Sequence, residues 1–134
     1  MEVKDLIGIP YKLGRHDLNK CGCYGAVHLF FKHIKGIDIP YGDGKIILPF
    51  WLRNRLLDGR RIMNGYQSVT KKIITNFDDL EPLDIMVYKG LRHDFAVGVI
   101  IDYEKCLTTS RSLGTFLMHY PKFRRLFYKG IRVL

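Results

Sequence analysis

The apolar positions follow a helical period early in the chain. Four apolar residues spaced i, i+3, i+4 and i+7 define one helix face: Val27, Phe30, Phe31 and Ile34. Gly36 is placed to cap the end of this helix, and Pro40 lies just beyond it. Cys23 falls on the same stripe, one turn before Val27. The pattern therefore predicts a helix whose first turn carries a cysteine.

From residue 83 onward the apolar runs become short, rich in β-branched residues and separated by turn signals. This pattern predicts about five strands, at residues 85–88, 96–102, 106–110, 115–120 and 128–133. A helix followed by a meander of strands predicts an α+β fold, with an N-terminal helix packed on a C-terminal antiparallel sheet.

The segment 41–77 has a mixed pattern and predicts an irregular insertion with modest helix content. Within it, residues 49–57 predict a short helix with Pro49 in its first turn and Gly59 after its end. The length of 134 residues predicts a single domain, residues 1–134. Such a domain buries enough surface to fold without a metal ion or a disulfide.

Charge and hydropathy narrow the classes of partner. The chain has 22 Lys and Arg residues against 13 Asp and Glu residues, which gives a formal charge of 22 − 13 = +9. The basic residues are dispersed, so the charge favours a generally anionic partner and makes nucleic acid the least favoured of them. No apolar run is long enough to span a membrane, and the first residues lack the layout of a secretory signal.

Cys23 is the candidate nucleophile. A helix N-terminus presents unpaired N–H groups and the positive end of the helix dipole, which together predict a stabilised thiolate with a lowered pKa. Gly22 and Gly25 keep the surroundings small enough for a substrate backbone to approach. The alternative is that Cys23 is a small apolar residue of the helix stripe. Cys21 and Cys106 complete an odd number of cysteines, which defines no disulfide framework.

A nucleophilic cysteine needs a base, and His93 is the candidate from its place just before the long predicted strand. His28 and His33 lie on the predicted helix itself, and His119 lies in an alternating strand pattern. The set His16, Cys21, Cys23 and His28 lacks the spacing of a zinc site. The sequence therefore predicts no metal and no cofactor.

Five segments together resemble the NlpC family of papain-like cell-wall cysteine peptidases, and most closely its phage-tail branch. They match, in order, the family motifs G-x-P-Y-x-x-G, D-C-x-G-hydrophobic, G-I-x-L-P, L-x-P-G-D-L-V-x-F and H-V-G-I-Y-x-G. The corresponding residues here are 8–14, 23–27, 36–40, 80–88 and 97–102. The resemblance implies a papain-like fold with a nucleophile helix packed on an antiparallel sheet.

The same resemblance implies the parts of a catalytic cleft. It makes Cys23 the nucleophile and assigns four further positions to the cleft: Tyr11, Gly22, Tyr24 and Thr108. His93 stays the candidate base from its place in the sequence, because it does not fall on the family's base position. The chain also departs from the family pattern. The family's aspartate before the cysteine is Gly22, its base histidine is Ala96, its imidazole-orienting residue falls near Thr108, and the glycine of its P-G-D motif is Leu83.

Two functions follow from this resemblance. The first is a phage tail-tip peptidase that cleaves peptidoglycan stem peptides during cell-wall penetration. The second is a tail component that keeps the fold after losing catalytic groups and acts as an adaptor on the tail hub. Aromatic and basic side chains would form its interface: Trp51, Arg53, Arg55, Arg60 and Arg61. Both predict partners among tail-hub and tail-tip proteins, and a virion location after synthesis in the host cytoplasm.

Overall fold

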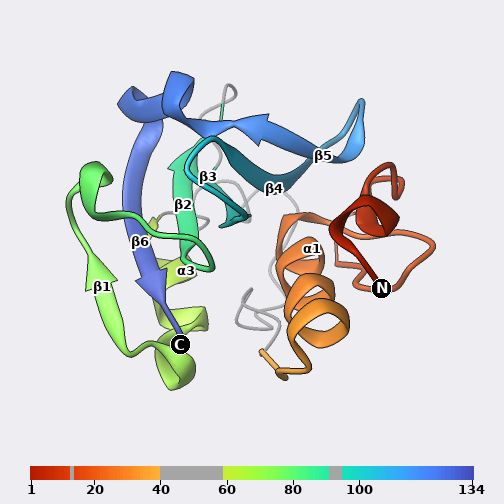
Figure 1. Ribbon diagram of the computed structural model, residues 1–134, viewed down its shortest axis with the longest axis horizontal. Helices are drawn as coiled ribbons and strands as arrows, with labels where there is room; N and C mark the ends of the chain where they lie inside the picture. The colour runs from red at the N-terminus through yellow and green to blue at the C-terminus, as the bar shows by residue number, and fades with distance from the viewer. Residues whose placement is uncertain (13, 40–58, 91–94) are drawn as a thin grey trace.

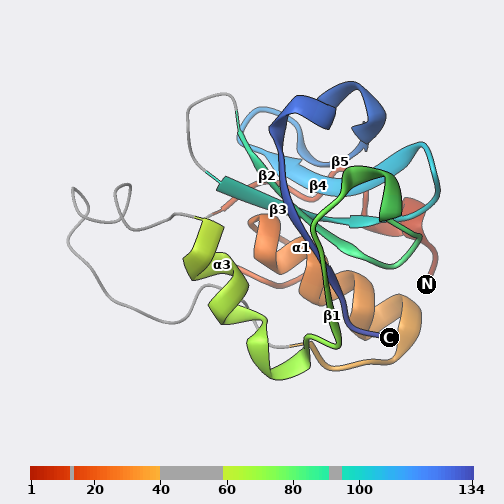
Figure 2. The same cartoon turned by 90° about the vertical axis from the view of Figure 1, so that its left-hand side faces the viewer.

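The computed structural model describes residues 1–12, 14–39, 59–90 and 95–134. Its centre is a six-stranded antiparallel sheet with the strand order β1-β6-β2-β3-β4-β5. Two α-helices lie on one side of this sheet, as Figure 1 and Figure 2 show from two directions. Helix and antiparallel sheet confirm the predicted α+β class.

The elements follow one another in a simple order along the chain. The helices are η1 (Val3–Leu6), α1 (Cys23–Phe30), the π-turn η2 (Phe31–Lys35), α3 (Gly59–Gly65), η3 (Gln67–Val69), η4 (Phe77–Asp79) and η5 (Tyr120–Leu126). The strands are β1 (Lys72–Ile74), β2 (Ile85–Lys89), β3 (Phe95–Ile100), β4 (Lys105–Ser110), β5 (Gly114–His119) and β6 (Phe127–Arg132).

The predicted nucleophile helix is confirmed. It begins at Cys23, continues through η2, and ends at Gly36, whose φ of 66° is the left-handed conformation of a helix C-cap. Val27, Phe30 and Phe31 are buried on the side that faces the sheet. The predicted helix 49–57 lies outside the described residues. α3 falls in the segment 41–77, for which the pattern predicted modest helix content without placing a helix at these residues.

The five predicted strands are confirmed as β2 to β6, but the sheet has a sixth member. β1 has only three residues, which is too few for an alternating pattern to be recognised. It pairs with β6 at one edge of the sheet, with Lys72 opposite Arg132 and Ile74 opposite Gly130. Strand order thus places β6, the last strand in the sequence, between β1 and β2.

Each face of the sheet carries its own hydrophobic core. On the side of α1 and α3, buried residues of the helices pack against alternate strand residues such as Val87, Val97 and Val99. On the other side, Met86, Tyr88, Ile100 and the residues around η4 and η5 form a second cluster. Strand side chains alternate between faces, so neighbouring residues of β3 belong to different clusters.

The N-terminal segment is fixed to β5 through Thr115. The Thr115 hydroxyl accepts the Ile9 N–H at 2.8 Å and donates to the Leu6 carbonyl. Main-chain bonds join Gly8 N–H to the Thr115 carbonyl and Thr115 N–H to the Ile9 carbonyl, both at 2.9 Å. This attachment determines where the chain enters the loop that leads to Cys23.

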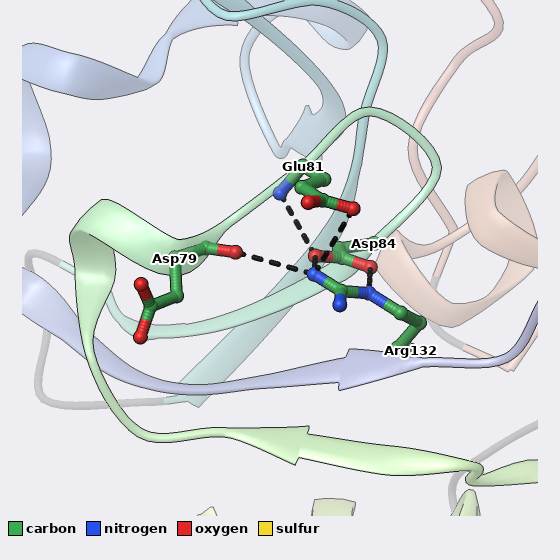
Figure 3. Close-up of polar contacts among 4 residues, drawn as sticks. All are labelled: Asp79, Glu81, Asp84 and Arg132. Carbon is green, nitrogen blue, oxygen red and sulfur yellow. Dashed lines mark hydrogen bonds and ion pairs between the residues drawn. The ribbon is translucent and has the colours of Figure 1, made fainter.

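A buried ion pair connects β6 to the turn before β2 (Figure 3). Asp84 is 1% exposed, and its carboxylate accepts Arg132 Nε at 3.0 Å, Arg132 Nη2 at 2.9 Å and the Glu81 N–H at 2.9 Å. Arg132 also donates to the Asp79 carbonyl at 3.2 Å and lies 3.4 Å from the Glu81 carboxylate. The guanidinium therefore satisfies a carboxylate that the fold removes from water.

Leu83, in the same turn, has a φ of 75°. This left-handed conformation is costly for a residue with a side chain, and it explains why the resembling motif has glycine there. Leu83 N–H donates to the Ile100 carbonyl at 2.7 Å, while the Asp84 carbonyl accepts from Ile100 N–H at 2.8 Å. The turn therefore extends the β2–β3 pairing in spite of its strained backbone.

In the part of the chain that the structure describes, none of the helices has the length and apolar character needed to cross a membrane.

We predict that Arg132→Met lowers the free energy of unfolding by about 2 to 3 kcal/mol, because the buried Asp84 carboxylate loses its charged partner. Urea denaturation measures this loss. Arg124→Met is the matched control, because its ion pair with Asp78 is exposed to solvent and screened. Equal stability losses in the two variants would contradict this reading of the buried pair.

We also predict that Leu83→Gly is more stable than Leu83→Ala by about 1 kcal/mol. Both substitutions remove the packing of the leucine side chain, but only glycine relieves the left-handed strain. Urea denaturation of the two variants under identical conditions measures the difference. A less stable glycine variant would show that the positive φ imposes no cost on the turn.

Candidate active site

The first turn of α1 begins at Gly22 without a side-chain cap. Gly22 is in an extended conformation, with φ −91° and ψ −172°, and it is buried. Its N–H donates to the Arg15 carbonyl at 3.0 Å, and its carbonyl accepts the Ala26 N–H at 2.9 Å. Because no side chain caps this end, the N–H groups of the first turn remain available to the residues around Cys23.

The loop before α1 lies directly against this turn. The Cys21 N–H donates to the Pro10 carbonyl at 3.1 Å, and the Lys12 N–H donates to the Cys21 carbonyl at 3.2 Å. Gly25 permits the contact, since a Cβ there would lie 2.3 Å from the Arg15 carbonyl oxygen. The bridge between Tyr11 and Cys21 thereby places Tyr11 next to the chain that enters the helix.

Asp17 stabilises the tip of the same loop. Its side chain accepts Arg15 Nε and the N–H groups of Asn19 and Lys20, each at 2.9 Å. The hydrogen bond from Arg15, followed by those from Lys20 and Asn19, lowers the pKa of Asp17 to about 2. The carboxylate is therefore charged at neutral pH and holds the turn between the two passes of the loop.

Cys23 is the first residue of α1 and is partly exposed, with the rest of the residue packed against the core. Burial of its thiol raises the pKa of Cys23, and this effect exceeds the opposing effect of backbone hydrogen bonds from Val97, Tyr24 and Cys23 itself. The prediction of a lowered pKa was wrong. The helix start does stabilise the thiolate, but removal of the sulfur from water outweighs that stabilisation.

The other two cysteines are buried free thiols. Burial, followed by the charges of Cys23 and Asp17, raises the pKa of Cys21 to about 11. Burial alone raises the pKa of Cys106 well above its usual range. All three thiols are thus mainly protonated at neutral pH, and Cys23 is the one of the three residues that is not fully buried.

Opposite the helix start, β3 and β4 separate. Their pairing is formed at Val99 with Leu107 and at Ile100 with Cys106, and it does not extend to Val97. Val97 faces the core under α1, whereas Ala96 packs on the other side of the sheet. Cys23 packs against the same core cluster as Val97, and a backbone hydrogen bond from Val97 lowers the pKa of its thiol against the larger effect of burial.

A hydrogen-bonded pair lies behind this strand end, on the face that carries Ala96. Tyr88 on β2 lies opposite Ala96 on β3, and the Tyr88 hydroxyl is 2.7 Å from Thr108 Oγ1 on β4. The Thr108 hydroxyl in turn donates to the Val97 carbonyl at 2.9 Å. Sequence reasoning identified Thr108 but missed Tyr88, because their contact depends on the register of three strands.

The structure describes four of the five histidines and does not describe the fifth, His93. His93, the candidate base, lies outside the described residues. His28 Nδ1 is 2.8 Å from the Ile39 carbonyl, and the ring of His16 packs edge-on against that of His28 with centroids 5.1 Å apart. His33 lies in η2 and the exposed His119 ends β5. The role of His93 stays a prediction.

The four predicted cleft residues have different settings. Tyr11 is partly exposed beside the loop, and Gly22 is the N-cap of α1. Tyr24 is 5% exposed, with its ring 6.4 Å from that of Tyr66, so its contribution to the site is through its backbone. Thr108 is fully buried and acts on the main chain of β3. Their contact with a substrate stays a prediction.

Among the described residues, no group of three or more His, Cys, Asp and Glu side chains is arranged to hold a metal ion. The chemistry that this arrangement offers is nucleophilic. The thiol of a partly exposed cysteine lies at a helix start with backbone donors around it, and a neighbouring base would have to accept its proton.

No protein-family model and no curated protein sequence matches the chain. Solved structures do match it in fold. The NlpC/p60 domain of the peptidoglycan hydrolase SagA is similar with a TM-score of 0.65 and 12% identity, over 96% of this chain and 91% of that domain.

Longer proteins contain the same fold. NlpC1 from Trichomonas vaginalis matches with a TM-score of 0.66 and 15% identity, over 98% of this chain and 41% of its own. An NlpC/p60 family protein from Bacillus cereus matches with a TM-score of 0.62 and 16% identity, over 100% of this chain and 41% of its own. The chain spans about two-fifths of these two proteins and has the NlpC/p60 fold, as the sequence resemblance implied.

Proposed function

We propose that the chain is a cysteine peptidase that cleaves stem peptides of peptidoglycan, with Cys23 as its nucleophile. The observation that carries the proposal is the position of Cys23, a partly exposed residue with a desolvated thiol at the start of α1, where the pairing of β3 and β4 ends. The resemblance of the sequence motifs and the similarity in fold to NlpC/p60 domains support the same substrate class.

The proposed reaction is acyl transfer in two steps. The Cys23 sulfur forms a bond to the scissile carbonyl carbon, its proton passes to His93, and that proton then leaves with the amine when the C–N bond breaks. Water attacks the resulting thioester, which releases the acid and restores the thiol. Backbone N–H groups at the start of α1 stabilise the negative oxygen in both steps.

The raised pKa of Cys23 makes the base essential to this scheme. A thiol that burial keeps protonated at neutral pH has little intrinsic reactivity, so helix and backbone donors alone do not supply the nucleophile. His93 is the candidate for this role from its position in the sequence, just before β3.

We place the peptidase at the tip of a phage tail. Support comes from the motifs that resemble the phage-tail branch and from the net charge of +9, which favours an anionic cell envelope. Tail-hub and tail-tip proteins would be its partners. Mass spectrometry of purified particles tests this location, and absence of the chain from particles made by its parent phage would refute it.

A second candidate function is a tail-hub adaptor that keeps the fold without catalysis. The observation that favours it is the chemistry at two positions, Ala96 and Thr108. The family that the sequence resembles has its base histidine at the first position and the residue that orients the imidazole near the second. Ala96 carries no titratable group, and the Thr108 hydroxyl is bonded to Tyr88 and to the main chain. In this case Cys23 would be a packing residue.

Cleavage of purified muropeptides distinguishes the two functions. As a peptidase, the chain should release peptide fragments, Cys23→Ala should release none, and His93→Ala should be slower by about 10³-fold because the thiol loses its proton acceptor. His119→Ala is the matched control, since His119 is exposed at the end of β5. If neither the unmodified chain nor Cys23→Ala releases peptide fragments, the peptidase function is refuted and the adaptor function is supported.

The raised pKa gives a prediction that does not depend on turnover. Thiolate is the reactive form, so alkylation of Cys23 by iodoacetamide should reach half its maximal rate well above the ordinary thiol pKa of about 8.5. Mass spectrometry of the peptide that contains Cys23 follows the reaction, with the urea-unfolded chain as reference. A rate that is already maximal at pH 7 would contradict the effect of burial.

A further inference from the structure

A chain of hydrogen bonds crosses three strands directly behind the separated end of β3. It runs from the Tyr88 hydroxyl on β2 to Thr108 Oγ1 on β4 at 2.7 Å, and from Thr108 to the Val97 carbonyl on β3 at 2.9 Å. Tyr88 is 7% exposed and Thr108 is fully buried. Because both side chains are withdrawn from water, these bonds are the ones that satisfy their hydroxyl groups.

The direction of the bonds follows from counting protons. A threonine hydroxyl has one proton, and Thr108 gives that proton to the Val97 carbonyl, which can only accept. Tyr88 must therefore donate to Thr108. Burial raises the pKa of Tyr88 far above its ordinary value and exceeds the lowering by its hydrogen bond with Thr108, so the phenol is protonated at neutral pH.

The small residues of β3 allow this crossing. Tyr88 and Thr108 belong to strands on either side of β3, so their side chains meet over its surface. Tyr88 stands opposite Ala96, and a Cβ on Gly98 would lie 3.1 Å from the Thr108 Cβ and 2.5 Å from Cys106 Sγ. Only a methyl group and a glycine lie beneath the bond between the two hydroxyls.

Thr108 replaces a missing main-chain bond. In an antiparallel sheet the N–H and C=O of one residue point to the same neighbouring strand, so both groups of Val97 face the gap between β3 and β4. The β3–β4 pairing stops at Val99, and a side-chain hydroxyl satisfies the Val97 carbonyl instead. The Val97 N–H faces the same gap, and Cys23 packs against the core cluster that contains Val97. A backbone hydrogen bond from Val97 accordingly opposes the rise in the pKa of the Cys23 thiol.

We propose that Tyr88 and Thr108 are positioning residues of the Cys23 site, which hold the main chain at Val97 so that its N–H faces the Cys23 sulfur. The proposal rests on the proposed role of Cys23 as a nucleophile. The resemblance implies that a residue near position 108 orients the imidazole of the base. In this chain, Thr108 orients a backbone group of β3 instead. Tyr88 acts on Cys23 only through Thr108 and Val97.

The pH profile of Cys23 alkylation tests the proposal. In Tyr88→Phe and Thr108→Val the Val97 main chain loses its support, so alkylation at pH 8 should slow by about 5-fold, the effect of one weakened hydrogen bond to a charged sulfur. Its midpoint should move to higher pH. Thr108→Ser keeps the hydroxyl and should retain the original profile, as should Tyr103→Phe, which alters an exposed phenol.

Unchanged profiles in folded Tyr88→Phe and Thr108→Val would overturn the proposal. A Thr108→Ser profile that matches Thr108→Val would also overturn it, because the hydroxyl would then be irrelevant. Should a variant not fold, NMR of the unsubstituted chain decides. The Val97 amide resonance should titrate together with Cys23 and stop doing so in Cys23→Ser, and a Val97 resonance that ignores pH in both would refute the proposal.

These readouts are independent of peptide cleavage. A chain that cleaves no muropeptide but shows the shifted alkylation profiles would refute the proposed peptidase and support the positioning pair. A chain that cleaves muropeptides with unchanged profiles would do the reverse.

Discussion

The geometry around Cys23 depends on the close approach of main chains at two glycines. At Gly25 the loop before α1 lies so near the helix that a Cβ would be 2.3 Å from the Arg15 carbonyl oxygen. At Gly98 a Cβ would be 2.8 Å from the Leu107 carbonyl oxygen. The first contact fixes the start of the helix, and the second fixes β3 against β4 just beyond their separated ends. Side chains at either position would move the thiol away from the strand that faces it.

The periodic parts of the fold were accessible from the sequence. α1 and strands β2 to β6 bury one face or both, and that burial leaves a pattern which local reading recovers. β1 was missed because three residues at a sheet edge carry no period. The helix α3 follows a segment of mixed pattern, and its contacts with β2 and β6 come from far along the chain. Local signals do not encode such contacts.

The site was recovered only where its chemistry is local. A cysteine at a helix start is a short-range feature, and its position was predicted correctly. The direction of its pKa shift was not, because burial of the sulfur depends on how α1 packs against the sheet. The bond between Tyr88 and Thr108 was equally hidden, since it requires the register of β2, β3 and β4 together. Sequence motifs thus located the thiol but not the polar groups that surround it.

The place of β6 in the sheet has a consequence for how the protein is made. β1 pairs with β6 and not with β2, although about fifty residues of chain separate β1 from β6. During translation, residues 72–74 must therefore wait without a strand partner until residues 127–132 have left the ribosome. The Arg132 guanidinium arrives at the same moment to neutralise Asp84, so the turn before β2 becomes stable only when this last strand is inserted. Pairing of β6 with β1 and β2 is consequently a late step that joins residues far apart in the sequence, as is typical of folds that form slowly.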